Sequence, residues 1–579
     1  MAYKPKKQAV SLDKEEVSGG SIDNIDNSDH LNTSTEHPKS EQIHHSKHLN
    51  GSTNNNHSAN SFKEKITHFL NDKYNLGFLV VLVIGFLLRL KYINQESIWN
   101  DSAVHLWYAI KVTLHPLFIF SREYILGDYV IPQTIMAFFY FFTKNILLAG
   151  KINTLLYFVV GMIFIYLLGK ELRSKFTGLM AATLLAFNHI FWFYSVRPLG
   201  DSPLLVTTII LLYGMVKLEK EKTMRWAIIS GFMFLACMFT KGQSSLYIFA
   251  LVIYYLIFKR TEMIHHKPTL VSWLIPVGSV FLAHIVGKLF FHAAILDRIF
   301  ALFVDMRGMP FGLESLGMLQ WIFSWYLVPF VIIGILFVIA YKEKQYYFGL
   351  VLLLFYYLFF EVNVDNTQDR YILPLLSVGI LLAVFAIEEM AAYLSMFTHK
   401  NLKHILVIIV IIFISWNYYQ AGDPLIYNKT FSYLGYQEAG QWIKDNVPVD
   451  APIFAGEYRS IRLFAEREYA GPIHEENGGT IWNLRSPFRY TEDNDGDVGK
   501  SNFENDVSNL SKNNDVYLEV DIWEYAQPKW YWPLSQESIN YFQSLGFKPM
   551  KVVERDVQTQ DGLKKMPVII IFKKDKVIS

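Results

Sequence analysis

About a dozen long apolar runs divide the chain, with short polar loops between most of them. Many of these runs approach the 20 residues that a helix needs to cross the hydrocarbon core of a bilayer. The runs cover residues 76–94, 125–143, 151–169, 176–195, 200–218, 226–240, 244–258, 270–291, 319–340, 346–361, 371–394 and 402–418. This pattern predicts a polytopic α-helical membrane protein.

The charge of the connecting loops predicts which side of the membrane each one occupies. Basic residues gather in every second loop, at 170–175, 217–225, 259–260, 342–344 and 399–404. The loops that alternate with them are 196–199, 241–243, 292–318 and 362–370. Because basic loops remain in the cytoplasm, the alternating loops are expected outside.

This alternation fixes the expected number of spans. The N-terminus and loop 170–175 both lie inside, so the region between them contains an even number of crossings. The run 125–143, which Pro132 interrupts, is therefore expected to be re-entrant or interfacial. We predict about eleven spans, a cytoplasmic N-terminus and an extracytoplasmic C-terminus.

The composition supports a membrane protein. Of the 579 residues, 52% are hydrophobic and 16% aromatic, and the mean hydropathy is +0.21. A formal net charge of +1 argues against a nucleic-acid partner. The single cysteine, Cys237, lies inside an apolar run, so the sequence contains no disulfide framework.

Composition also divides the chain into three parts. Residues 1–62 are polar and almost free of apolar side chains, which predicts a disordered cytoplasmic tail. Residues 76–420 form the membrane domain, with a first outer loop at 95–150. Residues 421–579 return to a mixed pattern that predicts an extracytoplasmic α/β domain. Its expected helices lie at 438–446 and 539–545, and its expected strands at 452–455, 516–520 and 567–572.

Ionisable residues stand at the ends of several apolar runs, and all of them fall on the predicted outer side. They are Asp101, Arg197, Asp201, Lys241, Asp369 and Arg370. Charged groups in or beside a bilayer are costly to keep, so they indicate a functional site by default. Their convergence on one face predicts chemistry on a charged, membrane-embedded substrate.

Asp101 allows two interpretations at this stage. A carboxylate just beyond the first span could act as a general base toward an acceptor hydroxyl. Asp is also a preferred residue at a helix N-terminus, so Asp101 could instead cap the helical stretch 102–114. Position alone does not separate the two.

Four short motifs in a fixed order together resemble the GT-C glycosyltransferases. They are Trp99-Asn100-Asp101, the stretch from Arg197 to Asp201, Thr240-Lys241-Gly242 and the element Arg370-Tyr371 with Pro374. The resemblance covers roughly residues 76–420 and is to the superfamily of dolichyl-phosphate-mannose protein mannosyltransferases and lipid A aminoarabinose transferases. Two positions depart from the usual pattern, because Ser102 stands where the family has Glu and His105 where it has an aromatic residue.

The resemblance implies a GT-C fold and an inverting transfer of a sugar from a polyprenyl (dolichyl) phosphate to an acceptor hydroxyl. It implies that Asp101 is the catalytic base, with Asp201 as a second catalytic candidate. The substrate-binding residues that it implies are Lys241, Arg370, Arg197, His105 and Tyr371. Cations among them, with Arg89 as a further candidate, would stabilise the phosphate leaving group.

The implied partners are a polyprenyl-phosphate sugar, membrane lipids and an acceptor that is a protein, a lipid or a glycan, in the cell membrane of a prokaryote. No metal and no cofactor are expected, because a lipid monophosphate carries no diphosphate for a divalent cation to hold. The alternatives are a transporter or lipid flippase, and a sensor or scaffold. Transporters place charges near the bilayer midplane and often contain internal repeats, whereas these charges lie at one face.

Overall fold

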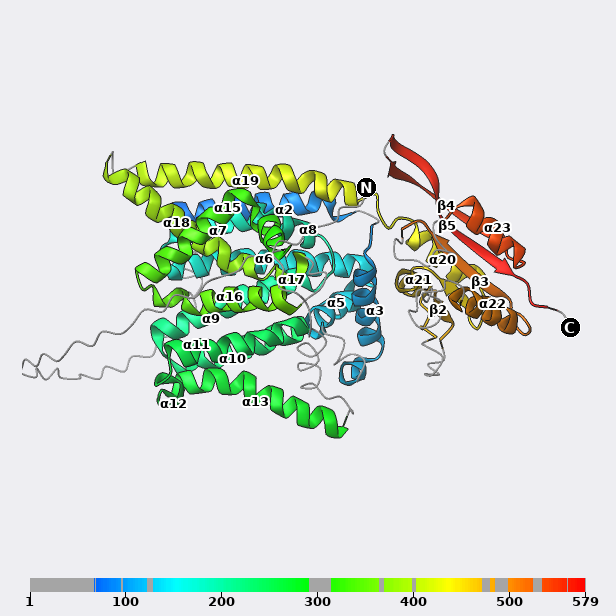
Figure 1. Cartoon of the computed structure of the whole chain (residues 1–579), viewed down its shortest axis with the longest axis horizontal. Coiled ribbons are helices and arrows are strands. Elements are labelled where there is room, and N and C mark those ends of the chain that lie inside the picture. Colours follow the sequence, from blue (N-terminus) through cyan, green and yellow to red (C-terminus); the bar gives the residue numbers. More distant parts are fainter. Residues whose placement is uncertain are drawn as a thin grey trace, which may run out of the picture. The chain divides into compact units, whose positions relative to one another are not determined.

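The computed structural model describes residues 67, 69–94, 97–121, 129–290, 314–363, 369–397, 402–470, 479–484, 498–523, 534–559 and 561–577 (Figure 1). These residues belong to one compact unit, Glu64–Ser579. The predicted tail 1–62 lies outside the described residues.

The apolar runs are mainly helical wherever the structure describes them, although the run 176–195 divides into two helices at Asn188. The helical elements of the membrane domain are α2 (Lys73–Ile93), α3 (Asn100–Leu114), η1 (Pro116–Phe120), α5 (Val130–Thr143), α6 (Ile146–Leu172), α7 (Lys175–Phe187), α8 (His189–Tyr194), α9 (Asp201–Glu221), α10 (Met224–Thr240), η2 (Gly242–Leu246), α11 (Tyr247–Phe258), α12 (Glu262–His265), α13 (Lys267–Phe290), α15 (Glu314–Ala340), η3 (Lys344–Tyr346), α16 (Tyr347–Asn363), α17 (Asp369–Ile372), α18 (Leu375–Met396) and α19 (Leu402–Lys429). The predicted fold class, a polytopic helical protein, is therefore confirmed.

Within the described residues, seven helices are long and apolar enough to cross a membrane, namely α2, α6, α9, α13, α15, α18 and α19. Five shorter apolar segments of 10–17 residues accompany them. At about 1.5 Å per residue, the 14-residue α5 measures only about 21 Å and is too short for an ordinary span. The predicted count of eleven spans requires the other four short segments to cross. One of them, the 13-residue α7, is shorter still and needs α8 to lengthen it, so the count stays a prediction.

Close backbone contact, rather than hydrophobicity, holds these helices together, because lipid is as apolar as the helix surfaces. Helices α9 and α18 are largely enclosed by their neighbours, whereas α2 and α13 face outward over most of their length. Helices α6 and α7 meet at Gly169 and Gly178, where a Cβ on Gly178 would lie 2.3 Å from the carbonyl oxygen of Tyr166. Only glycine allows this approach.

A kink in α15 is stabilised by polar side chains from two other helices. Ser324 has a φ of 59°, so the regular hydrogen bonds of the helix are interrupted there. The amide of Asn188 donates to the Ile322 carbonyl at 2.9 Å, and the Tyr418 hydroxyl donates to the Phe323 carbonyl at 2.6 Å. Freed carbonyl groups inside a membrane domain need such partners because no water replaces them.

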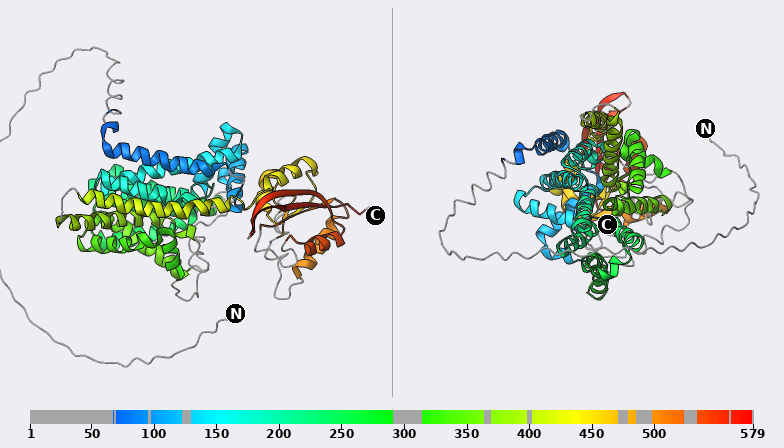
Figure 2. Two further views of the ribbon diagram at one scale, coloured as in Figure 1. Left: turned by 90° about the horizontal axis from the view of Figure 1, so that it is seen from above. Right: turned by 90° about the vertical axis from the view of Figure 1, so that its left-hand side faces the viewer.

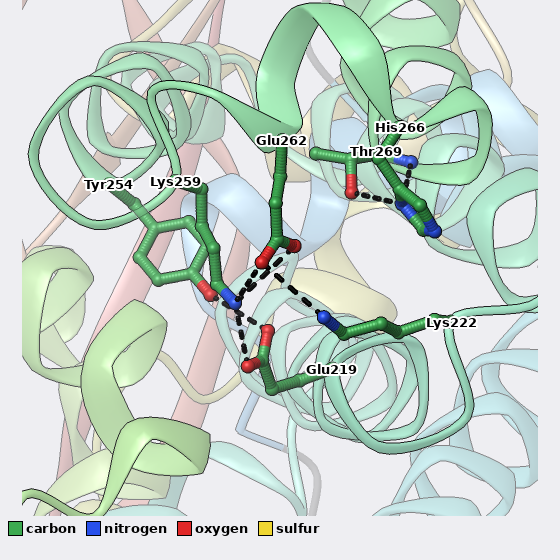
Figure 3. Close-up of polar contacts among 7 residues, drawn as sticks. All are labelled: Glu219, Lys222, Tyr254, Lys259, Glu262, His266 and Thr269. Atoms are coloured by element: carbon green, nitrogen blue, oxygen red, sulfur yellow. Dashed lines mark hydrogen bonds and ion pairs between the residues drawn. The ribbon is translucent and has the colours of Figure 1, made fainter. Parts of the chain in front are cut away.

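One group of basic loops meets at a common end of the bundle. Lys259, at the end of α11, pairs with Glu219 of α9 at 2.8 Å and with Glu262 of α12 at 3.4 Å (Figure 3). Lys222 reaches the same Glu262 at 3.3 Å. Helix α12 lies at the end of the bundle opposite α3 (Figure 1). The loops 217–225 and 259–260 therefore share one side, as the alternation of charges requires.

The C-terminal domain is a three-layer α/β structure. Its helices are α20 (Tyr436–Asn446), α21 (Tyr458–Ala465), α22 (Val498–Leu510) and α23 (Gln536–Ser544). Its strands are β1 (Ile453–Ala455), β2 (Ile481–Asn483), β3 (Val516–Asp521), β4 (Lys548–Thr559) and β5 (Gly562–Lys574), in the order β2-β1-β3-β5-β4. Strands β1, β2 and β3 are parallel, while β5 runs antiparallel to β3 and β4.

Side chains that alternate along the strands build two cores. Tyr517 of β3 packs with residues of α20 and α21, and the adjacent Leu518 packs with residues of α22 and α23. The two pairs of helices therefore cover opposite faces of the sheet, which Figure 2 shows from above. This parallel core places the ends of β1 and β3 side by side and orients α21, which follows β1.

The sequence predicted part of this domain. The expected helices and strands correspond to α20, β1, β3, α23 and β5, while α21, α22, β2 and β4 were missed. Helix α19 continues to Lys429, beyond the predicted end of the membrane domain at residue 420. Strands β4 and β5 form a hairpin whose turn contains Gly562 at a φ of 106°, a conformation that favours glycine.

Candidate functional site

Asp101 is held by two arginines at the start of α3. Its Oδ2 accepts a hydrogen bond from Nη1 of Arg370 at 2.5 Å, and its Oδ1 accepts one from Nη1 of Arg459 at 3.2 Å. The N-cap of α3 is Trp99, and no side chain caps this helix. The interpretation of Asp101 as a helix cap is therefore wrong. The carboxylate instead faces two cations that come from α17 and α21.

A second ion pair joins the start of α9 to the end of α10. Nζ of Lys241 donates to Oδ1 of Asp201 at 2.5 Å, and the two residues are only 6% and 3% exposed. A buried charge needs a partner of opposite sign, and removing one partner strands the other. This pairing explains how both residues can be ionised at an apolar helix–helix junction.

His105 lies one turn after Asp101 on α3 and is buried. Its Nδ1 is 3.1 Å from the amide nitrogen of Gln133, and its ring packs edge-on against Tyr129, with centroids 4.1 Å apart. Burial lowers the pKa of His105 to about 4, although the carboxylates of Asp101 and Asp201 oppose this shift. At neutral pH the ring is therefore uncharged. The ring interacts electrostatically with members of both ion pairs, so it lies near each pair.

Tyr371 connects the two cations of the site. Its ring centroid is 5.1 Å from Nζ of Lys241 and 5.4 Å from the guanidinium carbon of Arg370. Its backbone carbonyl accepts hydrogen bonds from the Gln243 amide at 3.0 Å and from the Tyr356 hydroxyl at 3.0 Å. Elements distant in sequence thus fix the position of Tyr371 and of the adjacent Arg370.

Asp369 anchors the short helix α17. Its Oδ1 accepts hydrogen bonds from the Tyr194 hydroxyl at 2.7 Å and from the Arg370 backbone N–H at 2.8 Å. Its Oδ2 accepts one from the Trp321 indole at 3.2 Å. Asp369 is therefore occupied in holding the backbone of the site, which distinguishes it from Asp101 and Asp201.

The arginines determine the protonation state of Asp101. Burial raises the pKa of the Asp101 carboxyl, but the hydrogen bond and charge of Arg370, with the charge of Arg459, outweigh it and hold the pKa below its ordinary value. The carboxylate charges in turn raise the pKa of Arg370 against the effect of burial. Asp101 is thus ionised throughout the physiological pH range and ready to accept a proton or a hydrogen bond.

Arg197 has a different environment from the paired cations. Its Nη1 donates to the Phe193 carbonyl at 2.7 Å, and its guanidinium lies over the Phe193 ring at 3.9 Å. Arg89 is fully buried, and its Nε donates to Oγ of Ser195 at 2.7 Å. Among the described residues, neither arginine forms an ion pair with a carboxylate. The sequence grouped Arg197 with Lys241 and Arg370, but the structure places it in separate surroundings.

Arg459 is the site residue that sequence reasoning missed. It lies in α21 of the C-terminal domain, 358 positions after Asp101. The same helix packs Leu463 into the apolar cluster around α3, and Arg462 lies over the Trp107 ring at 5.0 Å. The sequence shows two arginines three positions apart on a short amphipathic segment, which is a pattern typical of a contact surface. It does not show which residues these arginines contact. The C-terminal domain thereby contributes a side chain to the site.

Comparisons with known proteins agree with this architecture. Residues 130–286 match the family model of dolichyl-phosphate-mannose-protein mannosyltransferases. No curated protein matches the chain in sequence. The family match spans α5 to α13 and includes Asp201 and Lys241, but neither Asp101 nor Arg370.

Solved structures extend the similarity to most of the chain. The crystal structure of ArnT from Cupriavidus metallidurans bound to undecaprenyl phosphate is similar, with a TM-score of 0.51 and 11% identity, over 85% of this chain and 97% of that chain. The chain has the GT-C fold. The apo oligosaccharyltransferase of Archaeoglobus fulgidus matches at a TM-score of 0.51 and 12% identity, over 77% of this chain and 69% of that chain. The GT-C resemblance predicted from the sequence is therefore confirmed.

The GT-C fold is also known for the Archaeoglobus fulgidus enzyme in complex with an inhibitory peptide and a dolichol-phosphate. That structure matches at a TM-score of 0.50 and 13% identity, over 77% of this chain and 69% of that chain.

Within the described residues, no group of three or more His, Cys, Asp or Glu side chains is arranged to hold a metal ion. The predicted independence from metal remains a prediction.

The double contact of Asp101 yields a prediction about pH. Arg459→Gln removes one of the two positive charges that hold the Asp101 pKa down, so this pKa should rise. We expect the acidic limb of the activity profile to move to higher pH, while activity at pH 8 changes little. Arg462→Gln is the matched control, because Arg462 pairs with Glu468 at 2.9 Å on the same helix. Equal profiles for both variants would show that Arg459 does not act on Asp101.

Proposed function

We propose that this protein is a membrane glycosyltransferase that moves a sugar from a polyprenyl (dolichyl) phosphate to an acceptor hydroxyl. The observation that carries the proposal is the pair of carboxylate–cation contacts, Asp101 with Arg370 and Asp201 with Lys241. They lie on different helices and are linked by His105 and Tyr371. One carboxylate to take a proton and two cations to receive a phosphate are the groups that this reaction requires.

Lys241 and Arg370 are the proposed phosphate ligands. As the bond between the sugar and the phosphate breaks, negative charge develops on the leaving phosphate. Fixed cations in a low-dielectric site stabilise such charge without first reorganising solvent. Because a monophosphate can be neutralised by two side-chain cations, the proposed reaction requires no metal or cofactor, and we expect activity to survive chelation by EDTA.

Asp101 is the proposed general base. Its carboxylate would accept the acceptor's hydroxyl proton while the hydroxyl oxygen attacks the anomeric carbon from the face opposite the phosphate, which inverts the configuration. A low pKa makes the group a weak base in the resting site. If Arg370 moved toward the donor phosphate, Asp101 would lose part of the positive charge that stabilises its ionised form. The pKa of Asp101 would then rise, and the carboxylate would become a stronger base. Asp201, paired with Lys241, is the second catalytic candidate.

The similar proteins support a lipid-phosphate donor. ArnT was crystallised with undecaprenyl phosphate, and the archaeal oligosaccharyltransferase was studied with a dolichol-phosphate. The acceptor proposed for this chain is a protein, a lipid or a glycan. His105, neutral and held by Gln133, is the proposed contact for sugar or acceptor hydroxyls. The alternative of a transporter or flippase is less well supported, because the charged pairs lie at helix ends.

We further propose that the site faces the outside of a prokaryotic cell membrane, with a cytoplasmic N-terminus. Reporter proteins fused after Lys400 and after Ser432 should then report opposite sides, because only α19 separates these positions. Alkaline phosphatase activity is expected from the second fusion and green fluorescence from the first. If both fusions reported the same side, the proposed orientation of the C-terminal domain would be wrong.

Replacement of the base tests the catalytic assignment. Asp101→Asn keeps the size of the side chain but removes its ability to take a proton, and loss of a general base typically costs about 10²–10⁴ in rate. We expect transfer from a polyprenyl-phosphate sugar to fall by this factor when it is normalised to folded protein, while the loss of the charge beside Arg370 and Arg459 lowers the melting temperature. Asp423→Asn is the control, because Asp423 pairs with Lys91 at 2.6 Å, outside the two proposed catalytic pairs. Near-normal transfer by Asp101→Asn would shift the assignment to Asp201.

Replacement of a phosphate ligand tests donor binding. Lys241→Met should raise the KM for the lipid-phosphate donor by about tenfold or more, since charge-assisted hydrogen bonds are worth about 1.5–3 kcal/mol. Because this change leaves Asp201 buried without its partner, the double variant Lys241→Met with Asp201→Asn restores neutrality and should fold better. Donor affinity should stay low in both. A wild-type KM in either folded variant would make Lys241 a structural residue only.

A further inference from the structure

A small cavity of about 40 Å³ lies beside the start of α3. It is bounded by the end of α2, the first turns of α3 and α6, and the turn before α9. Its lining residues are Tyr92, Ile93, Ser97, Ile98, Ser102, Leu106, Leu147, Lys151, Val196, Arg197 and Pro198. The lining contains two cations and no carboxylate.

Two hydroxyl groups in this cavity have unused hydrogen-bonding capacity. Ser102 is fully buried, and its Oγ has no hydrogen-bond partner among the described residues. The same holds for the buried Oγ of Ser97. A buried polar atom without a partner is costly, so its presence at a cavity indicates a ligand that the chain alone does not supply. Both hydroxyls lie at the N-terminal end of α3, which has no side-chain cap.

The two cations that line the cavity differ from the paired cations of the site. Among the described residues, neither Lys151 nor Arg197 has a carboxylate partner, in contrast to Lys241 and Arg370. Lys429, at the end of α19, lies close enough to Arg197 for their charges to interact. The positive end of the α3 dipole adds to this potential.

Two carboxylates lie near the cavity wall, Asp101 and Asp423, and both are already paired with cations, Asp101 with Arg370 and Arg459. Asp423 accepts hydrogen bonds from the Tyr92 hydroxyl at 2.7 Å and from Lys91 at 2.6 Å. The groups that face the cavity are therefore two unpaired cations, two hydroxyl donors and a helix N-terminus. All five favour an anion with several acceptor oxygens.

We propose that this cavity is a phosphate-binding site, distinct from the Asp101–Arg370 and Asp201–Lys241 pairs. Lys151 and Arg197 would neutralise the phosphate charge, and Ser97 and Ser102 would donate hydrogen bonds to its oxygens. The ligand class is a phosphoryl group, carried either by a lipid headgroup or by a soluble molecule. None of its groups belongs to either ion pair, but the place of the site in the reaction rests on the proposed transferase function, and Arg197 is one of the substrate-binding residues that the family resemblance implies.

The position of Ser102 gives the site a place in the reaction. Ser102 directly follows Asp101, and adjacent Cα atoms lie about 3.8 Å apart. A phosphate bound at Ser102 would therefore bring the molecule that carries it next to the proposed base. Apolar residues on the same wall, such as Ile98 and Leu106, suit the acyl chains of a lipid headgroup.

Phosphate binding to the full-length protein tests the proposal directly. Equilibrium dialysis with radiolabelled inorganic phosphate, at constant ionic strength, would use the double variant Lys241→Met with Asp201→Asn, which weakens phosphate binding at the paired site and leaves no buried carboxylate without a partner. We expect saturable binding that Lys151→Met, added to this background, weakens by about tenfold or more. Lys144→Met is the matched control, because Lys144 lies over the Phe141 ring and does not line the cavity.

A second arm distinguishes the two sources of the phosphoryl group. Native mass spectrometry would compare retention of phosphatidylglycerol and phosphatidylcholine by the wild type, Lys151→Met and Lys144→Met. Selective retention of phosphatidylglycerol that depends on Lys151 indicates a lipid headgroup, and phosphate binding without it indicates a soluble ligand. If Lys151→Met reduces yield, Ser102→Ala carries the same expectation. Binding of both probes that is unchanged in folded cavity variants would overturn the proposal, whatever the transferase assays show.

Discussion

The cost of keeping charges at the edge of an apolar bundle governs the structure of this protein. An ionised side chain in such surroundings persists only when an opposite charge and hydrogen bonds replace the water that it lost. Asp201 and Lys241 meet this requirement with each other, and Asp101 meets it with Arg370 and Arg459. The helices must therefore end where these partners can meet, which ties the termini of α3, α9, α10 and α17 to one place.

The same pairing gives the site its capacity for chemistry. In the resting state each proposed phosphate ligand is compensated by a carboxylate, so a donor phosphate must share Lys241 and Arg370 with Asp201 and Asp101. In the proposed reaction this competition would limit the affinity for the spent lipid phosphate, and it would weaken the contact between Arg370 and Asp101 when a proton acceptor is needed. The network of Asp369, Tyr194 and Trp321 keeps the backbone of α17 fixed, so that only the Arg370 side chain has to move.

The sequence predicted the elements better than their contacts, for a physical reason. Apolar runs near 20 residues report directly on helices because burial and length are local properties, and the runs are mainly helical where described. Asp101, Asp201, Lys241 and Arg370 were also visible, since charge beside an apolar run is a local anomaly. The partners of Asp101 were not visible, because Arg459 is 358 positions away and looks like any surface arginine of a soluble domain.

Errors in the C-terminal domain have a related origin. Strand β2, which the sequence did not predict, has three residues, too few for a period-two pattern, and it gains its stability from parallel pairing with β1. Pro424 and Asp423 signal a break close to the predicted end of the membrane domain, yet α19 continues to Lys429. Asp423 is satisfied there by Lys91 and Tyr92 of α2. A polar residue that suggests the end of a helix can thus be stabilised within it by a tertiary contact.

The two groups of cations represent opposite solutions to one electrostatic problem. Lys241 and Arg370 are neutralised within the protein, so the fold is stable without a ligand and a bound phosphate can leave after reaction. Lys151 and Arg197 are left uncompensated beside hydroxyls without partners, which makes the fold itself favour an anion at that place. A site that must release its product after each reaction requires the first arrangement, in which the cations are neutralised by carboxylates. A site that retains or positions its ligand is served by the second, and the residues that represent the two sites on α3, Asp101 and Ser102, are adjacent in the sequence.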